Sequence, residues 1–219
     1  MSETWDPQAF LNTPIHAFDF QVMIGDIIDF LEFSENNIEW QLRRELQEIR
    51  RRDELEGFPP GYREHLEENA EFRFGVSLPL RVRYAAVISL VTSVEWSMRH
   101  LVKHFKVPNC KNETIRCMMK GLQDFTRIQR NEDITVFEDI LQVRNCIVHS
   151  AGLLRDDKYS DEISASVRKL DGFSLENRHF LGTHVYIQRG ALNPYAERMK
   201  QLVIELRDCG NRQSTASAK

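Results

Sequence analysis

The chain has 219 residues, enough for one large domain or for one domain with an extension. Hydrophobic residues make up 42% and charged residues 28%, which are the proportions of a globular protein with a core of ordinary size. The formal net charge of −4 excludes a protein that coats nucleic acid through bulk positive charge, so an RNA-acting protein of this composition needs a small, specific site or a local basic patch.

Helical periodicity dominates the first half of the chain. A long helix is predicted over about residues 14–55, because apolar residues recur there at helical spacing with few breakers. Glycines and prolines at 57–61 predict a firm break, and a short charged helix is predicted over 62–71. The next strong helix is predicted over 79–105, starting near a proline that suits the first helical turn.

Two further helices are predicted over 113–125 and 133–148, with Asn112 as the N-cap of the first and Gly152 as the end of the second. The pattern then changes between residues 163 and 190. Alternating and β-branched stretches, separated by turn residues, predict a small hairpin or a three-stranded meander there.

The end of the chain returns to helix. Asn193 and Pro194 supply a cap and a first-turn proline for a last helix that reaches about Cys209. The small, polar residues after it predict a disordered tail. We therefore expect an all-α helical bundle with an N-terminal helical extension (1–77), a helical domain (78–209) that carries a small β-hairpin insert at about 163–190 before the last helix, and a tail (210–219).

A cytoplasmic protein without a membrane segment is predicted. No apolar run approaches the roughly 20 residues that a membrane span needs, and residues 1–7 lack the basic start and apolar stretch of a signal peptide. The spacings of the cysteines match no zinc pattern, so we expect reduced thiols. These cysteines are Cys110, Cys117, Cys146 and Cys209.

Two charged residues stand on the apolar stripes of the two most hydrophobic predicted helices. Wound at about 100° per residue, the helix 133–148 places Arg144 between Phe137 and Ile140, and the helix 79–105 places Glu95 on its own stripe. An unpaired buried charge is very costly. We therefore expect Glu95 and Arg144 to form an ion pair where these helices pack. The alternatives are a pair with a purely structural role, or stripes that face a protein partner.

The helix that carries Arg144 ends in the sequence Arg-Asn-Cys-Ile-Val-His, residues 144–149. Asn145 and His149 are four residues apart on its polar face, so their side chains can be neighbours. The segment resembles the signature of HEPN ribonucleases, an arginine followed by four to six residues and a histidine, commonly with asparagine directly after the arginine. An acidic residue in an earlier core helix, placed like Glu95, is also similar to the family pattern. The resemblance covers about residues 78–206.

This resemblance implies a HEPN-like bundle that acts as a metal-independent endoribonuclease without a cofactor, as in toxins and antiviral defence effectors. His149 would be the acid or base and Arg144 would stabilise charge on the phosphate. Asn145 would orient the reacting groups, and Glu95 would hold Arg144. The 2′-hydroxyl of RNA would be the nucleophile, which leaves 2′,3′-cyclic phosphate and 5′-hydroxyl ends.

Arg144 and His149 are five residues apart, so they point about 140° away from each other on a regular helix. Enzymes of the family that the chain resembles typically assemble the site from two copies. The resemblance therefore implies a homodimer with paired motifs, with RNA and a cognate antitoxin protein as further partners. Two alternatives stay open: a non-catalytic HEPN module that binds RNA, nucleotide or a protein, and a helical scaffold in which the motif is coincidental.

His100 and His104 have the i, i+4 spacing of metal ligands on the helix 79–105. The residues between them lack the glutamate of a zinc protease helix, and no third ligand is evident. We therefore predict a solvated face rather than a metal site, with a basic rim for phosphate as the alternative.

Overall fold

A computed structural model describes residues 16–108, 114–154, 159–178 and 182–217 of the chain. Its elements are α2 (His16–Glu56), α3 (Tyr62–Ala70), the π-helical turn η1 (Glu71–Ser77), α4 (Leu78–Phe105), α5 (Ile115–Thr126), α6 (Asn131–Ser150), α7 (Ser160–Lys169), β1 (Phe173–Arg178), β2 (Gly182–Ile187) and α8 (Asn193–Ser217). The strands form one antiparallel hairpin. The expected all-α architecture, with a long N-terminal helix and a small hairpin before the last helix, is therefore confirmed.

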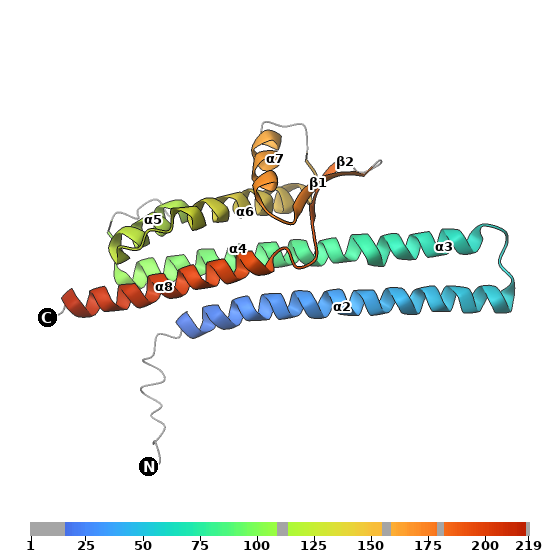
Figure 1. Cartoon of the computed structure of the whole chain (residues 1–219), viewed down its shortest axis with the longest axis horizontal. Coiled ribbons are helices and arrows are strands. Elements are labelled where there is room, and N and C mark those ends of the chain that lie inside the picture. The colour runs from blue at the N-terminus through green and yellow to red at the C-terminus, as the bar shows by residue number, and fades with distance from the viewer. Residues whose placement is uncertain (1–15, 109–113, 155–158, 179–181, 218–219) are drawn as a thin grey trace, which may run out of the picture.

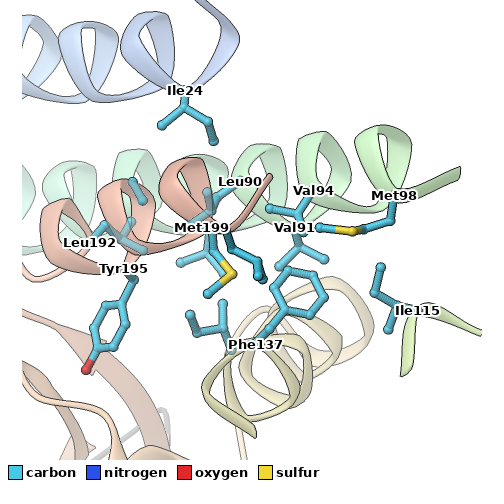
Figure 2. Close-up of a cluster of buried hydrophobic side chains, with 14 of the residues drawn as sticks. Ile24, Leu90, Val91, Val94, Met98, Ile115, Phe137, Leu192, Tyr195 and Met199 are labelled. Atoms are coloured by element: carbon cyan, nitrogen blue, oxygen red, sulfur yellow. The ribbon is translucent and has the colours of Figure 1, made fainter. Parts of the chain in front are cut away.

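The central element is α4, which packs against α2, α5, α6 and α8 (Figure 1). Figure 2 shows how side chains from these helices meet around it. The residues drawn and labelled there are Ile24 of α2; Leu90, Val91, Val94 and Met98 of α4; Ile115 of α5; Phe137 of α6; Leu192, which directly precedes α8; and Tyr195 and Met199 of α8. Because α2 contributes to the same core, the described part of the expected N-terminal extension packs directly on the helical domain.

The predicted break at 57–61 is present, because Gly57 and Gly61 adopt positive φ angles of 65° and 81°. The predicted start of a separate helix near Pro79 is wrong: α3, η1 and α4 form one uninterrupted helix. Proline lacks an N–H and its ring crowds the preceding turn of a helix. The π-helical residues directly before α4 widen that turn, which accounts for a proline inside the continuous helix.

The continuous helix Tyr62–Phe105 is long and apolar enough, by length and composition, to cross a membrane. The sequence-based expectation that no such segment exists therefore needs qualification. Within α4, however, Val87, Leu90 and Val94 are at most 1% exposed and pack inside the protein. Of the apolar window in this helix, 28% is buried inside the protein.

The expected strand character near 163–170 is wrong, because residues 163–169 belong to α7 and Leu170 caps its end. The helix has acidic residues in its first turn and basic residues in its last turn, as the helix dipole favours. Ile163, Val167 and Leu170 recur at helical spacing and face the core. Small polar and apolar residues alternate here over a short stretch, which fits the period of two of a strand. Packing against α6 favours the helical period instead.

Two predictions about helix ends, at the C-terminus of α8 and the N-terminus of α5, also change. Residues 210–217, expected to be disordered, continue α8, and Gly210 is buried with no room for a side chain because a Cβ there would lie 2.3 Å from the ring of Phe105. The expected cap Asn112 lies outside the described residues. The cap of α5 in the structure is Thr114, whose hydroxyl oxygen accepts from the backbone N–H of Cys117 at 3.4 Å.

A buried ion pair joins α2 to α4, between Glu35 and Arg83. The two residues are 5% and 8% exposed. Arg83 Nη1 also donates to the carbonyl of Ile187 in β2 at 2.8 Å, and Arg189 Nε lies 3.4 Å from the second carboxylate oxygen of Glu35. One arginine therefore fixes the long helix, the central helix and the hairpin relative to one another.

Candidate functional site

The predicted motif occupies the last two turns of α6. This helix ends at Ala151 and Gly152, which have positive φ angles of 53° and 81°. The hydroxyl of Ser150 lies 2.7 Å from the carbonyl oxygens of Cys146 and Leu153, and it donates to one of them at a time. The Ser150 hydroxyl thus binds backbone carbonyls at the end of the helix, which leaves it poorly placed to act as a nucleophile.

Gly152 locks this helix end onto the rest of the molecule. Its carbonyl accepts from Val185 N at 2.9 Å, and the Tyr84 hydroxyl donates to the carbonyl of Val185. A Cβ on Gly152 would lie 2.1 Å from the Tyr84 oxygen. Only glycine allows this approach, so α4, α6 and β2 meet at a fixed distance beside the motif.

A hollow of about 450 Å³ opens on the polar side of the motif. Residues of α6 form one wall, and α7 with the residue before it forms the other. The lining residues are Gln142, Asn145, Cys146, His149, Ser150, Tyr159 and Ile163. Asn145 and His149, predicted to be neighbours on one face, therefore line the same hollow, and His149 is exposed to solvent there.

The second wall of the hollow is held by Asp139, a nearly buried residue of α6. Its Oδ1 accepts a hydrogen bond from Ser166 Oγ at 2.8 Å and one from Lys169 Nζ at 3.1 Å, and both donors belong to α7. This carboxylate fixes α7 against α6. The hollow therefore has walls with a defined spacing.

Arg144 lies beside this hollow and does not line it. The residue is half-buried, and its Nη1 donates to Asn145 Oδ1 at 3.1 Å. Its Nε is buried and has no hydrogen-bond partner among the described residues. His149 lines the hollow and Arg144 does not, and residues five apart on a regular helix point about 140° away from each other. Within one chain, Asn145 is the residue that connects the guanidinium to the hollow.

The expected ion pair between Glu95 and Arg144 is not formed in the described part of the chain, where Glu95 is half-buried and makes no ion pair. The helices α4 and α6 do pack, but Phe137 lies level with Val91 (Figure 2) and Gly152 meets Tyr84. Arg144 therefore lies level with the turn around residue 88. Glu95 is about 10 Å further along the axis, at about 1.5 Å per residue.

The buried face of α6 also differs from the expected stripe. It centres on Ile140, Val143 and Ile147, which are at most 6% exposed, whereas Val148 on the other side of Arg144 is 47% exposed. Arg144 thus lies at the edge of the buried face. A charge at that edge reaches water and does not require a buried carboxylate.

The two histidines at metal-ligand spacing are engaged with aromatic neighbours. The His100 ring lies 4.1 Å from that of Trp96, and the His104 ring lies 4.9 Å from that of Phe105, as measured between centroids. Among the residues that the structure describes, no group of three or more His, Cys, Asp or Glu side chains is placed to hold a metal ion.

Sequence reasoning overlooked two residues of the site. Tyr159 presents an aromatic ring that is 50% exposed at the mouth of the hollow, ten residues after His149. Asp139 holds α7, which forms the same wall of the hollow as Tyr159. An aromatic residue that follows the motif closely is the signal that could have identified Tyr159.

No family model, curated protein or solved structure matches the chain. The functional assignment therefore rests on the residues themselves.

Proposed function

We propose that this protein is a metal-independent endoribonuclease of the HEPN type, a toxin or antiviral defence effector that cuts RNA at the end of α6. The observation that carries this proposal is the hollow in which Asn145 and His149 stand together beside Arg144. A histidine is the side chain best suited to move protons near neutral pH. An arginine supplies a permanent positive charge with several donors for phosphate oxygens.

The reaction follows from these groups. His149 accepts the proton of a ribose 2′-hydroxyl, and the resulting oxygen attacks the adjacent phosphorus. The bond to the 5′-oxygen breaks, and that oxygen takes a proton from His149 of the partner subunit, which leaves 2′,3′-cyclic phosphate and 5′-hydroxyl ends. Arg144 stabilises the negative charge that gathers on the phosphate through its half-buried guanidinium, which lies beside the hollow and contacts Asn145.

The partition of the motif between two sides of α6 favours a site built from two copies. Arg144 and the edge residues Leu141 and Val148 lie outside the hollow, on a flank of α6 that is partly or largely exposed. A second copy on this flank would bring its own arginine and histidine to the same phosphate. A homodimer with paired motifs is therefore part of the proposal.

A second candidate function is a non-catalytic module of the same type that binds RNA, a nucleotide or a protein. The net charge of −4 supports this candidate, as does the lack of an ion pair between Glu95 and Arg144 in the part of the chain that the structure describes. The two candidates differ in what His149 does. Catalysis needs the imidazole, whereas binding relies on the guanidinium.

The discriminating experiment measures RNA binding and RNA cleavage in excess chelator for the wild type, Arg144→Ala and His149→Ala. A nuclease predicts that His149→Ala binds RNA with wild-type affinity and does not cut it. Binding by the wild type that is lost in Arg144→Ala and unchanged in His149→Ala, with intact RNA in every sample, supports the binding module. Intact and unbound RNA in all samples, across single-stranded and structured substrates, contradicts the nuclease and the RNA-binding module.

A further inference from the structure

The long helix α2 is apolar on two opposite faces. One face packs into the protein through Phe20, Ile24 and Leu31, which are at most 3% exposed. The other face carries large hydrophobic side chains that the described chain leaves in solvent. These are Val22, Phe30, Phe33 and Trp40, which are 40%, 60%, 70% and 54% exposed.

These four exposed residues lie on one face of α2, which we call the α2 outer stripe. Relative to Phe33, the side chains of Val22 and Trp40 lie within about 20° and that of Phe30 within about 60° around the helix. The stripe extends over about 27 Å at 1.5 Å per residue. Large apolar side chains that gather on one exposed face are typical of an interaction site.

Charged residues of opposite sign lie toward the two ends of the stripe. Asp26 and Asp29 lie on the same face between Val22 and Phe30, and Arg44 lies on it beyond Trp40. None of the three makes an ion pair with another described residue. Arg44 instead stacks over the ring of Trp40, with its guanidinium carbon 5.6 Å from the ring centroid.

We propose that the α2 outer stripe binds the outer stripe of a second copy of this chain, with the two helices antiparallel. Antiparallel helices bring together residues whose numbers have a constant sum. With a sum of 70, Phe30 meets the partner's Trp40 and Asp26 meets the partner's Arg44. The same register sets Phe33 against the partner's Asn37 near the symmetry axis. In this register two aromatic pairs and two opposite-charge pairs form symmetrically, as a twofold interface requires, while Val22 faces the partner's Glu48 at the edge.

This interface is separate from the proposed nuclease dimer. In Figure 1 the central helix α4 lies between α2 and α6, and it packs against both. Pairing through the stripe therefore leaves the two copies of His149 far apart. A protein that uses both surfaces assembles into particles larger than a dimer, and this inference stands even if the chain cuts no RNA.

The test measures the mass of the full-length protein in solution by light scattering, for the wild type and charge-reversal variants. Asp26→Arg and Arg44→Asp each place like charges opposite each other, so each variant should lower the mass of the assembly at least twofold. The double variant Asp26→Arg/Arg44→Asp restores opposite charges and should regain the wild-type mass. Phe33→Asp should also lower the mass at least twofold.

Phe72→Asp is the matched control, because Phe72 is an aromatic residue of η1 that is 51% exposed and lies off the stripe. It should leave the mass unchanged, and helical circular dichroism confirms that each variant is folded. The proposal is overturned if none of the stripe variants lowers the wild-type mass. That result would follow from a monomer, from pairing through another surface, or from a stripe covered by residues 1–15 of the same chain. A double variant that fails to recover the mass overturns the antiparallel register.

Discussion

Arg83 of α4 binds Glu35 of α2 inside the protein, where both side chains are at most 10% exposed. The same guanidinium donates to the carbonyl of Ile187, so one residue joins three elements. Removing one partner of a buried ion pair typically costs about 3–5 kcal/mol, because the remaining charge is left in a poorly solvated site.

We therefore predict that Arg83→Met lowers the free energy of unfolding by about 3–5 kcal/mol, as measured by chemical denaturation. Glu35→Gln should cost less, because the amide can still accept from Arg83 at a site where Arg189 lies nearby. The double variant Glu35→Leu/Arg83→Met should recover part of the loss. Independent, additive effects of the two sites would contradict the pairing.

The second prediction concerns Glu95, which sequence reasoning paired with Arg144. Because Glu95 makes no ion pair in the described chain, Glu95→Gln should change the free energy of unfolding of the monomer by less than about 0.5 kcal/mol. A loss near that predicted for Arg83→Met would show that Glu95 has a buried cationic partner after all. Dilute protein keeps any contact with a second copy out of the measurement.

The fold was largely predictable from sequence, because apolar residues recur with the helical period of 3.6 residues along the long amphipathic helices. The helix around Ile163 was not predictable, because its apolar residues and small polar residues fit both the strand period of two and the helical period of 3.6. Packing on α6 decides between the two. The partner of Arg144 could not be predicted either. Winding a helix gives the direction of a side chain around the axis, whereas pairing also depends on the register between helices, which the sequence does not state.

The buried position of Arg83, which pairs with a carboxylate, could have been predicted from the sequence. On α4, Arg83 lies within about 20° of Leu90 and Val94 around the helix axis, and both are at most 1% exposed. By the helical spacing that placed Glu95 on an apolar face, Arg83 is therefore an even stronger candidate for a buried charge. The motif residues Asn145 and His149, four apart, were placed together correctly because that relationship lies within a single helix.

The third prediction concerns the joint between α4, α6 and β2. Gly152→Ala should destabilise the protein by about 1–3 kcal/mol, as overpacking does, because its Cβ would overlap the Tyr84 hydroxyl in a left-handed backbone conformation. Thermal and chemical denaturation measure the loss. Gly25→Ala is the control: nothing lies within 4 Å of its Cβ position in α2, so it should stabilise by about 0.5–1 kcal/mol.

The fourth prediction concerns Tyr159 at the mouth of the hollow. If a base of the RNA stacks on its ring, Tyr159→Ala loses about 1–3 kcal/mol of binding free energy. RNA affinity should then fall about 5- to 150-fold, as measured by fluorescence anisotropy with the cleavage-deficient His149→Ala background. Tyr159→Phe keeps the ring and should bind like its parent. Equal losses in both variants would point to the hydroxyl instead of stacking.

The most direct test of the proposed nuclease is the single-turnover cleavage rate of RNA in excess chelator, wild type against His149→Ala. Loss of a general acid or base typically reduces such a rate about 10²- to 10⁴-fold. The account predicts a loss in this range and wild-type products that end in 2′,3′-cyclic phosphate. Equal rates for the two proteins, or a wild type that cuts only after a divalent metal is added, would contradict it.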